Sequence, residues 1–145
     1  MTVEELIEIE AIKQLKSRYL RLLDTKQWDE WRDVFTEDFY GKYSGPHPDV
    51  ELHGRDEKVE TNAIFLQDVV TTHHAYTPEI EIIGPNTVKG IWAMDDYVGH
   101  PGNKYNGYGH YHEEYRKCED GKWRIAKIRL TRLRVDMIAS QTASQ

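Results

Sequence analysis

One stretch indicates the fold of this chain: residues 107–125, which read GYGHYHEEYRKCEDGKWRI. Near its end, Asp120-Gly121 is a dipeptide typical of the tight turn in a β-hairpin. Residues that favour extended structure flank this turn on both sides. The stretch therefore predicts two antiparallel strands, over residues 107–119 and 122–136.

Two more strands are predicted immediately before this hairpin. They cover residues 71–83 and 87–98, and Gly84-Pro85-Asn86 is predicted as the turn between them. Residues 99–106 are rich in Gly, Pro and Asn, which predicts a loop. Four consecutive strands joined in this way predict a long antiparallel meander.

The N-terminal part has a helical pattern instead. Residues 3–24 carry an apolar stripe, at intervals of three and four residues, that includes Ile12 and Tyr19. This spacing predicts an amphipathic helix. Thr2 and Glu5 have the spacing of a capping box at its start.

Shorter elements follow this helix. They are a helix with Trp28, Trp31, Val34 and Phe35 on one face and Thr25 as its N-cap, a strand over 39–43, a loop over 44–49 and a helix over 56–66. Helices followed by a long meander predict the α+β class, with a curved antiparallel sheet wrapped on the N-terminal helices. Such a sheet would leave a cone-shaped cavity, which is a usual place for a small-ligand site.

Length and composition limit the classes of protein to consider. The 145 residues predict one domain over 1–139 and a frayed polar tail over 140–145. The net charge of −6 argues against nucleic-acid binding, because phosphate recognition requires a basic surface. No apolar run approaches the ~20 residues that a membrane span needs. Cys118 has no partner for an intrachain disulfide, and the acidic N-terminus does not resemble a signal peptide, so a cytoplasmic location is expected.

Four of the seven histidines fall in two short runs, within residues 72–74 and 110–112. Histidine changes its charge near neutral pH, so it suits both proton transfer and metal binding. Adjacent residues of a strand face opposite sides, so only one of His73 and His74 can face an internal cavity. The two runs therefore predict a pocket lined for chemistry.

Two residues of the first helix are further candidates. Asp24 lies away from the apolar stripe, so it can reach a cavity only if the helix ends near Leu23. Tyr19 lies on the stripe, and its position fits either core packing or a cavity wall.

Several segments resemble SnoaL-like proteins of the nuclear transport factor 2-like superfamily. The similar segments are residues 8–35 with Tyr19, Asp24 and Trp28, residues 72–82, residues 107–115 and residues 120–125. The resemblance implies a cone-shaped, cystatin-like α+β barrel with an internal pocket. Within the superfamily, the chain is most similar to the branch that holds scytalone dehydratase, lindane dehydrochlorinase and bile-acid 7α-dehydratase. Those enzymes use a His–Asp pair for proton transfer, although the fold also carries isomerases, cyclases and non-catalytic members.

The resemblance implies roles for individual residues. His73 matches the general base, with His74 as the alternative if the strand carries a bulge. Asp24 matches the acid that orients this base, and Tyr19 would donate a hydrogen bond to a substrate oxygen. The residues expected to contact the substrate are His74, His110, His112, Tyr43, Trp92 and Tyr108.

The expected activity is that of a lyase of the dehydratase type, or of an isomerase, acting on a hydrophobic ring-bearing molecule without cofactor or metal. A non-catalytic small-molecule-binding or assembly module with the same cavity is a second hypothesis. A metal-dependent enzyme that uses His110 and His112 is a third, because these residues share one face of a strand.

The last strand also suggests self-association. In residues 122–136, strict alternation would place Trp123 and Ile125 on one face and Ile128 and Leu130 on the other. Both faces of the sheet would then be partly apolar, and the outer face would meet another subunit. We therefore expect a homo-oligomer, either a trimer or a dimer.

Overall fold

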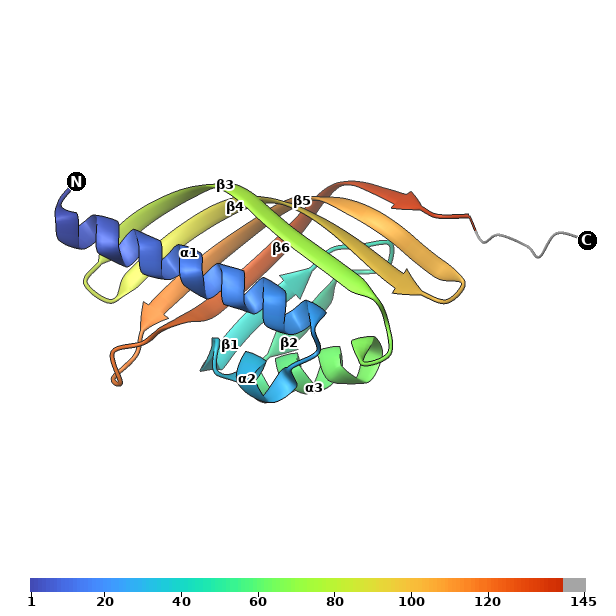
Figure 1. The fold of residues 1–145 in the computed structure, drawn as a ribbon, viewed down its shortest axis with the longest axis horizontal. Coiled ribbons are helices and arrows are strands. Elements are labelled where there is room, and N and C mark those ends of the chain that lie inside the picture. The colour runs from blue at the N-terminus through green and yellow to red at the C-terminus, as the bar shows by residue number, and fades with distance from the viewer. Residues whose placement is uncertain (140–145) are drawn as a thin grey trace, which may run out of the picture.

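A curved sheet forms the largest part of the molecule (Figure 1). The computed structural model describes residues 1–139, so the predicted frayed tail, residues 140–145, lies outside the described residues. Within the described range the chain forms three helices and six strands. In chain order they are α1 (Val3–Asp24), α2 (Trp28–Arg32), β1 (Phe35–Tyr43), β2 (Val50–His53), α3 (Arg55–Leu66), β3 (Thr71–Gly84), β4 (Thr87–His100), β5 (Asn103–Lys117) and β6 (Trp123–Met137).

The strands lie in the order β2-β1-β6-β5-β4-β3. Neighbouring strands are antiparallel, as in the predicted meander of the last four strands, except β1 and β6, which are parallel. β2 and β3 are the two edges, so the sheet curves without closing into a barrel. Figure 1 shows α1 lying across the arch of the sheet, with α2 and α3 grouped near β1 and β2. The predicted α+β class, a curved sheet on N-terminal helices, is confirmed.

Helix α1 follows its predicted pattern from end to end. Thr2 Oγ1 accepts a hydrogen bond from the Glu5 amide at 3.1 Å, and the Glu5 carboxylate accepts one from the Thr2 amide at 3.0 Å, which is the predicted capping box. The apolar stripe packs into the core, with Ile12 fully buried and Tyr19 nearly so. The helix ends at Asp24, where the chain turns away. Neither α1 nor any other helix of residues 1–139 is long and apolar enough to cross a membrane.

The segment after α1 differs from the prediction. α2 covers only Trp28–Arg32, and Thr25, predicted as its N-cap, instead closes α1 with its hydroxyl donating to the Arg21 carbonyl at 2.7 Å. Phe35 does not continue the helix but opens β1, where it pairs with Ile125 of β6. Pairing with a strand distant in sequence therefore decides the conformation here, in place of the local helical spacing.

Two other segments are more regular than predicted. β4 extends to His100 and β5 begins at Asn103, so the predicted loop over 99–106 shrinks to a tight turn with Gly102 at φ 76°. After the loop over 44–49, β2 adds an edge strand that the sequence did not predict. This strand has four residues and buries only Leu52. It is therefore too short to produce a periodic signal in the sequence.

A bulge in β6 brings its apolar residues to one face. Ile125 pairs with Tyr115 and Lys127 pairs with Glu114, so Ala126 has no partner on β5. The extra residue reverses the alternation. The apolar residues on the buried face are Trp123, Ile125, Ile128 and Leu130. The predicted split of these residues over two faces is wrong, which removes the basis on which β6 suggested a subunit contact.

The core also contains a buried ion pair. Lys16 Nζ lies 2.5 Å from Glu113 Oε2, and neither side chain is exposed. The Tyr115 hydroxyl donates to the other Glu113 oxygen at 2.6 Å and accepts a hydrogen bond from Trp92 Nε1 at 2.8 Å. The ammonium also lies 3.5 Å from the centre of the Tyr111 ring. Burial lowers the pKa of Lys16, and the neighbouring Glu113 carboxylate opposes this shift.

Candidate active site

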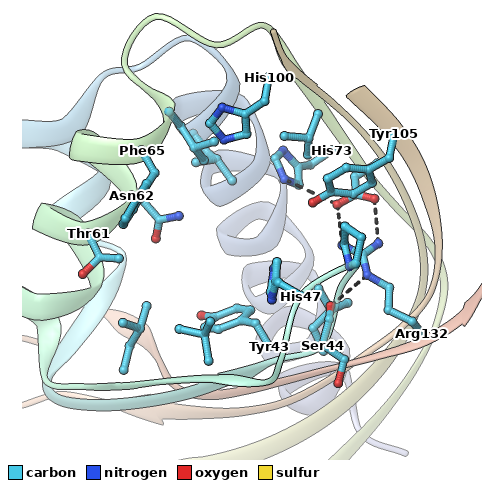
Figure 2. Close-up of a pocket in the computed structure, with 18 of the residues that line it drawn as sticks. Tyr43, Ser44, His47, Thr61, Asn62, Phe65, His73, His100, Tyr105 and Arg132 are labelled. Atoms are coloured by element: carbon cyan, nitrogen blue, oxygen red, sulfur yellow. Dashed lines mark hydrogen bonds and ion pairs between the residues drawn. The ribbon is translucent and has the colours of Figure 1, made fainter. Parts of the chain in front are cut away.

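A cavity of about 360 Å³ lies between the helices and the inner face of the sheet. This volume falls within the range of small-ligand sites, roughly 300–1,000 Å³. Figure 2 shows Asn62 and Phe65 of α3 on one side of it, and His73, Tyr105 and Arg132 of the strands on the other. Polar side chains interrupt the lining, but most of its surface is apolar, so a ligand with a mostly apolar body fits it best.

His73 lines this cavity and forms a hydrogen-bonded pair with Asp24, which lies outside the cavity lining. Asp24 Oδ1 lies 2.7 Å from His73 Nδ1, and Asp24 Oδ2 accepts a hydrogen bond from the His73 amide, also at 2.7 Å. Because an ionised carboxylate can only accept, Nδ1 is the donor in this contact, and in the neutral imidazole Nε2 is then the acceptor. The His73 side chain is 10% exposed, so this acceptor is largely shielded from water. An imidazole held in this way can remove a proton from a ligand.

The register of β3 determines which histidine faces inward. Pairing with β4 is continuous over residues 71–76 and places His73 opposite Asp96 on the inner face. His74 consequently faces outward, where its side chain is 60% exposed and its Nδ1 lies 3.0 Å from Asp95 Oδ1. The alternative in which a bulge turns His74 inward is therefore wrong, because the irregularity in β3 comes later in the strand.

Thr71 and Lys26 complete the contacts around Asp24. Thr71 Oγ1 donates a hydrogen bond to Asp24 Oδ1 at 3.0 Å and accepts one from Lys26 Nζ at 2.7 Å. Partial burial lowers the pKa of Lys26, and Asp24 opposes this shift. Together with the two contacts to His73, these interactions fix the orientation of the carboxylate.

A second carboxylate, Asp96, lies near the other nitrogen of the His73 ring, with 3.9 Å between its Oδ2 and Nε2. Arg132 binds both oxygens of Asp96, at 2.6 and 2.9 Å, and its Nε donates to the Ser44 carbonyl at 3.0 Å. Gly107 makes room for this pair, because a Cβ there would overlap both charged side chains. Burial opposes the charge on Arg132, but its bonds to Asp96 hold the Arg132 pKa above its ordinary value. Arg132 therefore neutralises a charge that would otherwise stand alone beside His73.

Two tyrosine hydroxyls add to the polar part of the wall. Tyr19 and Tyr43 both line the cavity, and the Tyr43 hydroxyl is buried without a hydrogen-bond partner in residues 1–139. The Tyr19 ring packs edge-on against Phe35 and Tyr111, which fixes its direction. Burial raises the pKa of Tyr19 and of Tyr43 well above the ordinary range, so both hydroxyls remain protonated at neutral pH. Each can therefore donate a hydrogen bond to a ligand oxygen.

Four other predicted substrate contacts lie away from this cavity. Tyr108, His110 and His112 lie on the outer face of β5, because the alternate residues of that strand take the buried positions. Trp92 is buried in the core and does not reach the cavity wall. These predictions are corrected accordingly, as is that of His74 above, and Tyr43 is the one predicted substrate contact that lines the cavity.

The pair formed by His110 and His112 bears on the metal-dependent alternative. Their ring centres lie 6.3 Å apart on the outer face of β5. Within residues 1–139, no group of three or more His, Cys, Asp or Glu side chains is arranged to hold a metal ion. The two histidines thus lack a third protein ligand in the described part of the chain.

Sequence reasoning missed several polar residues of the cavity lining, among them Asp96, Arg132 and Lys58. A signal for Asp96 was present, because adjacent acids at 95 and 96 in a strand must face opposite sides and one of them must face inward. Lys58 and Asn62 are four residues apart and share a face of α3, so the cavity side of this helix begins with a lysine. No comparable signal exists for Arg132, because its position depends on irregular pairing between β5 and β6.

The fold and the site define a class: an α+β protein whose sheet and helices enclose a cavity, lined by a histidine that is hydrogen-bonded to an aspartate. The SnoaL-like domain family matches residues 4–129 of the chain. The chain therefore belongs to the SnoaL-like family, in the nuclear transport factor 2-like superfamily.

Similar proteins agree with this assignment. A protein of Gibberella zeae named as a probable cyclase is 30% identical over 134 residues, which cover 84% of this chain and 89% of the relative. The structure of a candidate scytalone dehydratase from Novosphingobium aromaticivorans superposes with a TM-score of 0.82 at 22% identity, covering 99% of this chain and 95% of the other. The structure of a hexachlorocyclohexane dehydrochlorinase gives a TM-score of 0.82 at 18% identity, covering 99% and 97%. At these identities the two structures share the fold with this chain.

Proposed function

We propose that this protein is a cofactor-independent lyase of the dehydratase type, or an isomerase, that acts on a hydrophobic ring-bearing small molecule. The observation that carries the proposal is the Asp24–His73 pair, which is hydrogen-bonded at 2.7 Å and presents His73 to a largely apolar cavity. The names of the similar proteins support it, because removing water or hydrogen chloride from a molecule requires removal of a proton.

His73 would act as the general base through Nε2. In an elimination, the electrons of the broken C–H bond form the new double bond, and the leaving group departs with its own electron pair. Asp24 holds the imidazole in the required tautomer and stabilises the imidazolium that forms. Tyr19 would donate a hydrogen bond to a substrate oxygen, and the low dielectric of the cavity strengthens each of these interactions. In an isomerisation, the same imidazolium would return the proton to a different carbon.

The base can be tested before the physiological substrate is identified. Hydroxylated ring compounds would first be screened for thermal stabilisation of the protein. Compounds that bind would then be incubated in D₂O, with deuterium uptake at carbon and loss of water followed by mass spectrometry. Wild type should catalyse one or both processes. His73→Ala should lower the rate by roughly 10²–10⁴-fold, which is the usual contribution of general acid–base catalysis.

Three variants serve as controls for this test. Asp24→Asn should also lower the rate, and the double variant should be little worse than His73→Ala alone, because residues that act as one unit are not additive. His74→Ala changes a side chain on the outer face and should retain full activity. Ligand stabilisation without any turnover or exchange in wild type would instead favour the alternative, a non-catalytic binding module with the same cavity.

Two further expectations, on oligomeric state and cellular location, belong to the same proposal. A homo-oligomer, trimer or dimer, is still expected, because the outer face of the sheet exposes aromatic and aliphatic side chains at Tyr76, Ile91 and Tyr108. Light scattering at micromolar concentration tests this, and a monomer would contradict it. A cytoplasmic location is likewise proposed, and fractionation of the source cells would test it.

A further inference from the structure

Lys58 is a buried amine on the wall of the cavity, and the acid–base chemistry proposed above does not use it. The residue lies on the cavity side of α3 and is 2% exposed. Within residues 1–139 the charged groups that act on its Nζ are Lys16 and Glu113, and the two Glu113 oxygens bond to Lys16 and Tyr115 instead of to Lys58. The contrast is with Lys16, the other buried lysine, whose Nζ lies 2.5 Å from a Glu113 oxygen. Lys58 is therefore a buried amine without a counter-ion in the described part of the chain.

Aromatic rings surround this amine. The ring centres within about 6 Å of Nζ belong to Tyr43 at 4.1 Å, Trp31 at 5.1 Å, Tyr19 at 5.8 Å, Phe35 at 5.8 Å and Phe39 at 6.0 Å. Such rings attract an ammonium, but their faces do not replace the hydrogen bonds that its three N–H groups make with water. Burial lowers the pKa of Lys58 well below its ordinary range; Lys16 adds to this effect, and Glu113 opposes it. The environment therefore favours the neutral amine, whose lone pair is nucleophilic.

We propose that Lys58 is a covalent carbonyl-binding site, at which Nζ condenses with an aldehyde or ketone held in the cavity to form an imine. The lone pair of Nζ attacks the carbonyl carbon, a C–N bond forms, and the carbonyl oxygen becomes a hydroxyl group. The C–O bond then breaks, and both amine hydrogens leave with that oxygen as water. No group is oxidised or reduced, so no co-reactant is required.

Tyr43 is placed to assist this step. Its ring is the closest to Nζ, and its hydroxyl lacks a partner in residues 1–139. Because burial keeps this hydroxyl protonated, it can donate a hydrogen bond to the carbonyl oxygen as negative charge develops there. Amine and donor lie on the wall of the same cavity, so an apolar carbonyl compound can reach both.

The proposal is tested by reductive trapping. The full-length protein would be incubated at pH 7 with one equivalent of benzaldehyde and sodium cyanoborohydride, which reduces the imine to a stable secondary amine. Peptide mapping by mass spectrometry would then compare Lys58 with Lys13, an exposed lysine of α1. An ordinary lysine of pKa about 10.4 is neutral in only about one molecule in 2,500 at pH 7. Lys58 should therefore be labelled on the order of 10²–10³-fold faster than Lys13.

Two variants separate this site from general lysine chemistry. Lys58→Met keeps an unbranched chain of similar length and should lose the fast label, whereas Lys13→Met should retain it. Equal labelling rates at the two lysines of wild type would overturn the proposal, whether or not the Lys58 variant folds. His73→Ala should retain the label at Lys58, because imine formation does not require the base. The labelling of Lys58 and the activity of His73→Ala thus test the Lys58 proposal and the proposed role of the Asp24–His73 pair independently.

Discussion

Removing one member of the buried Lys16–Glu113 pair should cost much more than removing the charges of both. Lys16→Met replaces the ammonium with an apolar group of similar length and leaves the Glu113 carboxylate unexposed, with the Tyr115 hydroxyl as its remaining donor. Breaking a buried pair in this way costs about 3–5 kcal/mol. Typical stabilities of ~0.05–0.15 kcal/mol per residue give about 7–22 kcal/mol for this chain. The loss is therefore a large share of the total, and should lower Tm by about 6–20 °C at ~2–4 °C per kcal/mol.

The double variant Lys16→Met/Glu113→Gln provides the comparison. It removes both charges but keeps an oxygen that can accept from Tyr115, so we expect it to lose only about 1–3 kcal/mol. Urea unfolding of wild type, both single variants and the double variant gives the coupling energy between the two positions. The reasoning is refuted if Lys16→Met unfolds at the wild-type midpoint, or if the double variant loses as much as the two single variants combined.

Two further predictions follow from the polar groups around the cavity. Gly107→Ala should force Arg132 away from Asp96 and lower the free energy of unfolding by about 3 kcal/mol, since a buried carboxylate loses its partner; an unchanged urea midpoint contradicts this. Stability should also rise with pH between the lowered folded-state pKa of Lys58 and about 10.4, because in that window the unfolded chain binds a proton that the folded chain does not. In Lys58→Met the free energy of unfolding, measured from pH 6 to about pH 9, should rise less with pH than in wild type. Equal slopes in the two proteins would count against the argument.

Local patterns predicted the elements whose stability is mainly local. α1 needs only its stripe and its capping box, and both are present in the sequence. The pairing of β5 with β6 is indicated by the turn at Asp120-Gly121. By contrast, Phe35 has a spacing that fits a helix, and only its pairing with Ile125, ninety positions later, makes it part of a strand. Contacts at such separation leave no periodic signal near either residue.

Some residues of the candidate site were likewise indicated by the sequence, whereas others could be placed only with the tertiary structure. The resemblance to a family pointed to Asp24 and His73, and the structure brings them within hydrogen-bond distance; their catalytic role remains a prediction. The outer-face histidines were misplaced, because alternation along β5 identifies residues that share a face without saying which face is buried. Lys58 was missed because a lysine on a helix is ordinarily exposed, and only the tertiary structure shows that this one is covered.

The two oxygens of Asp24 contact two parts of one residue, the ring and the backbone amide of His73. These contacts close a loop of covalent and hydrogen bonds that ties the orientation of the imidazole to the path of its own strand. All the atoms in this loop belong to the protein, so a ligand has to contribute none of its binding energy to assembling it. Choice among ligands then rests with the remaining cavity wall, where single substitutions can change shape and polarity while leaving the Asp24–His73 pair intact. This separation between the Asp24–His73 pair and the rest of the cavity wall would allow members of one family to keep a common base and acquire different substrates.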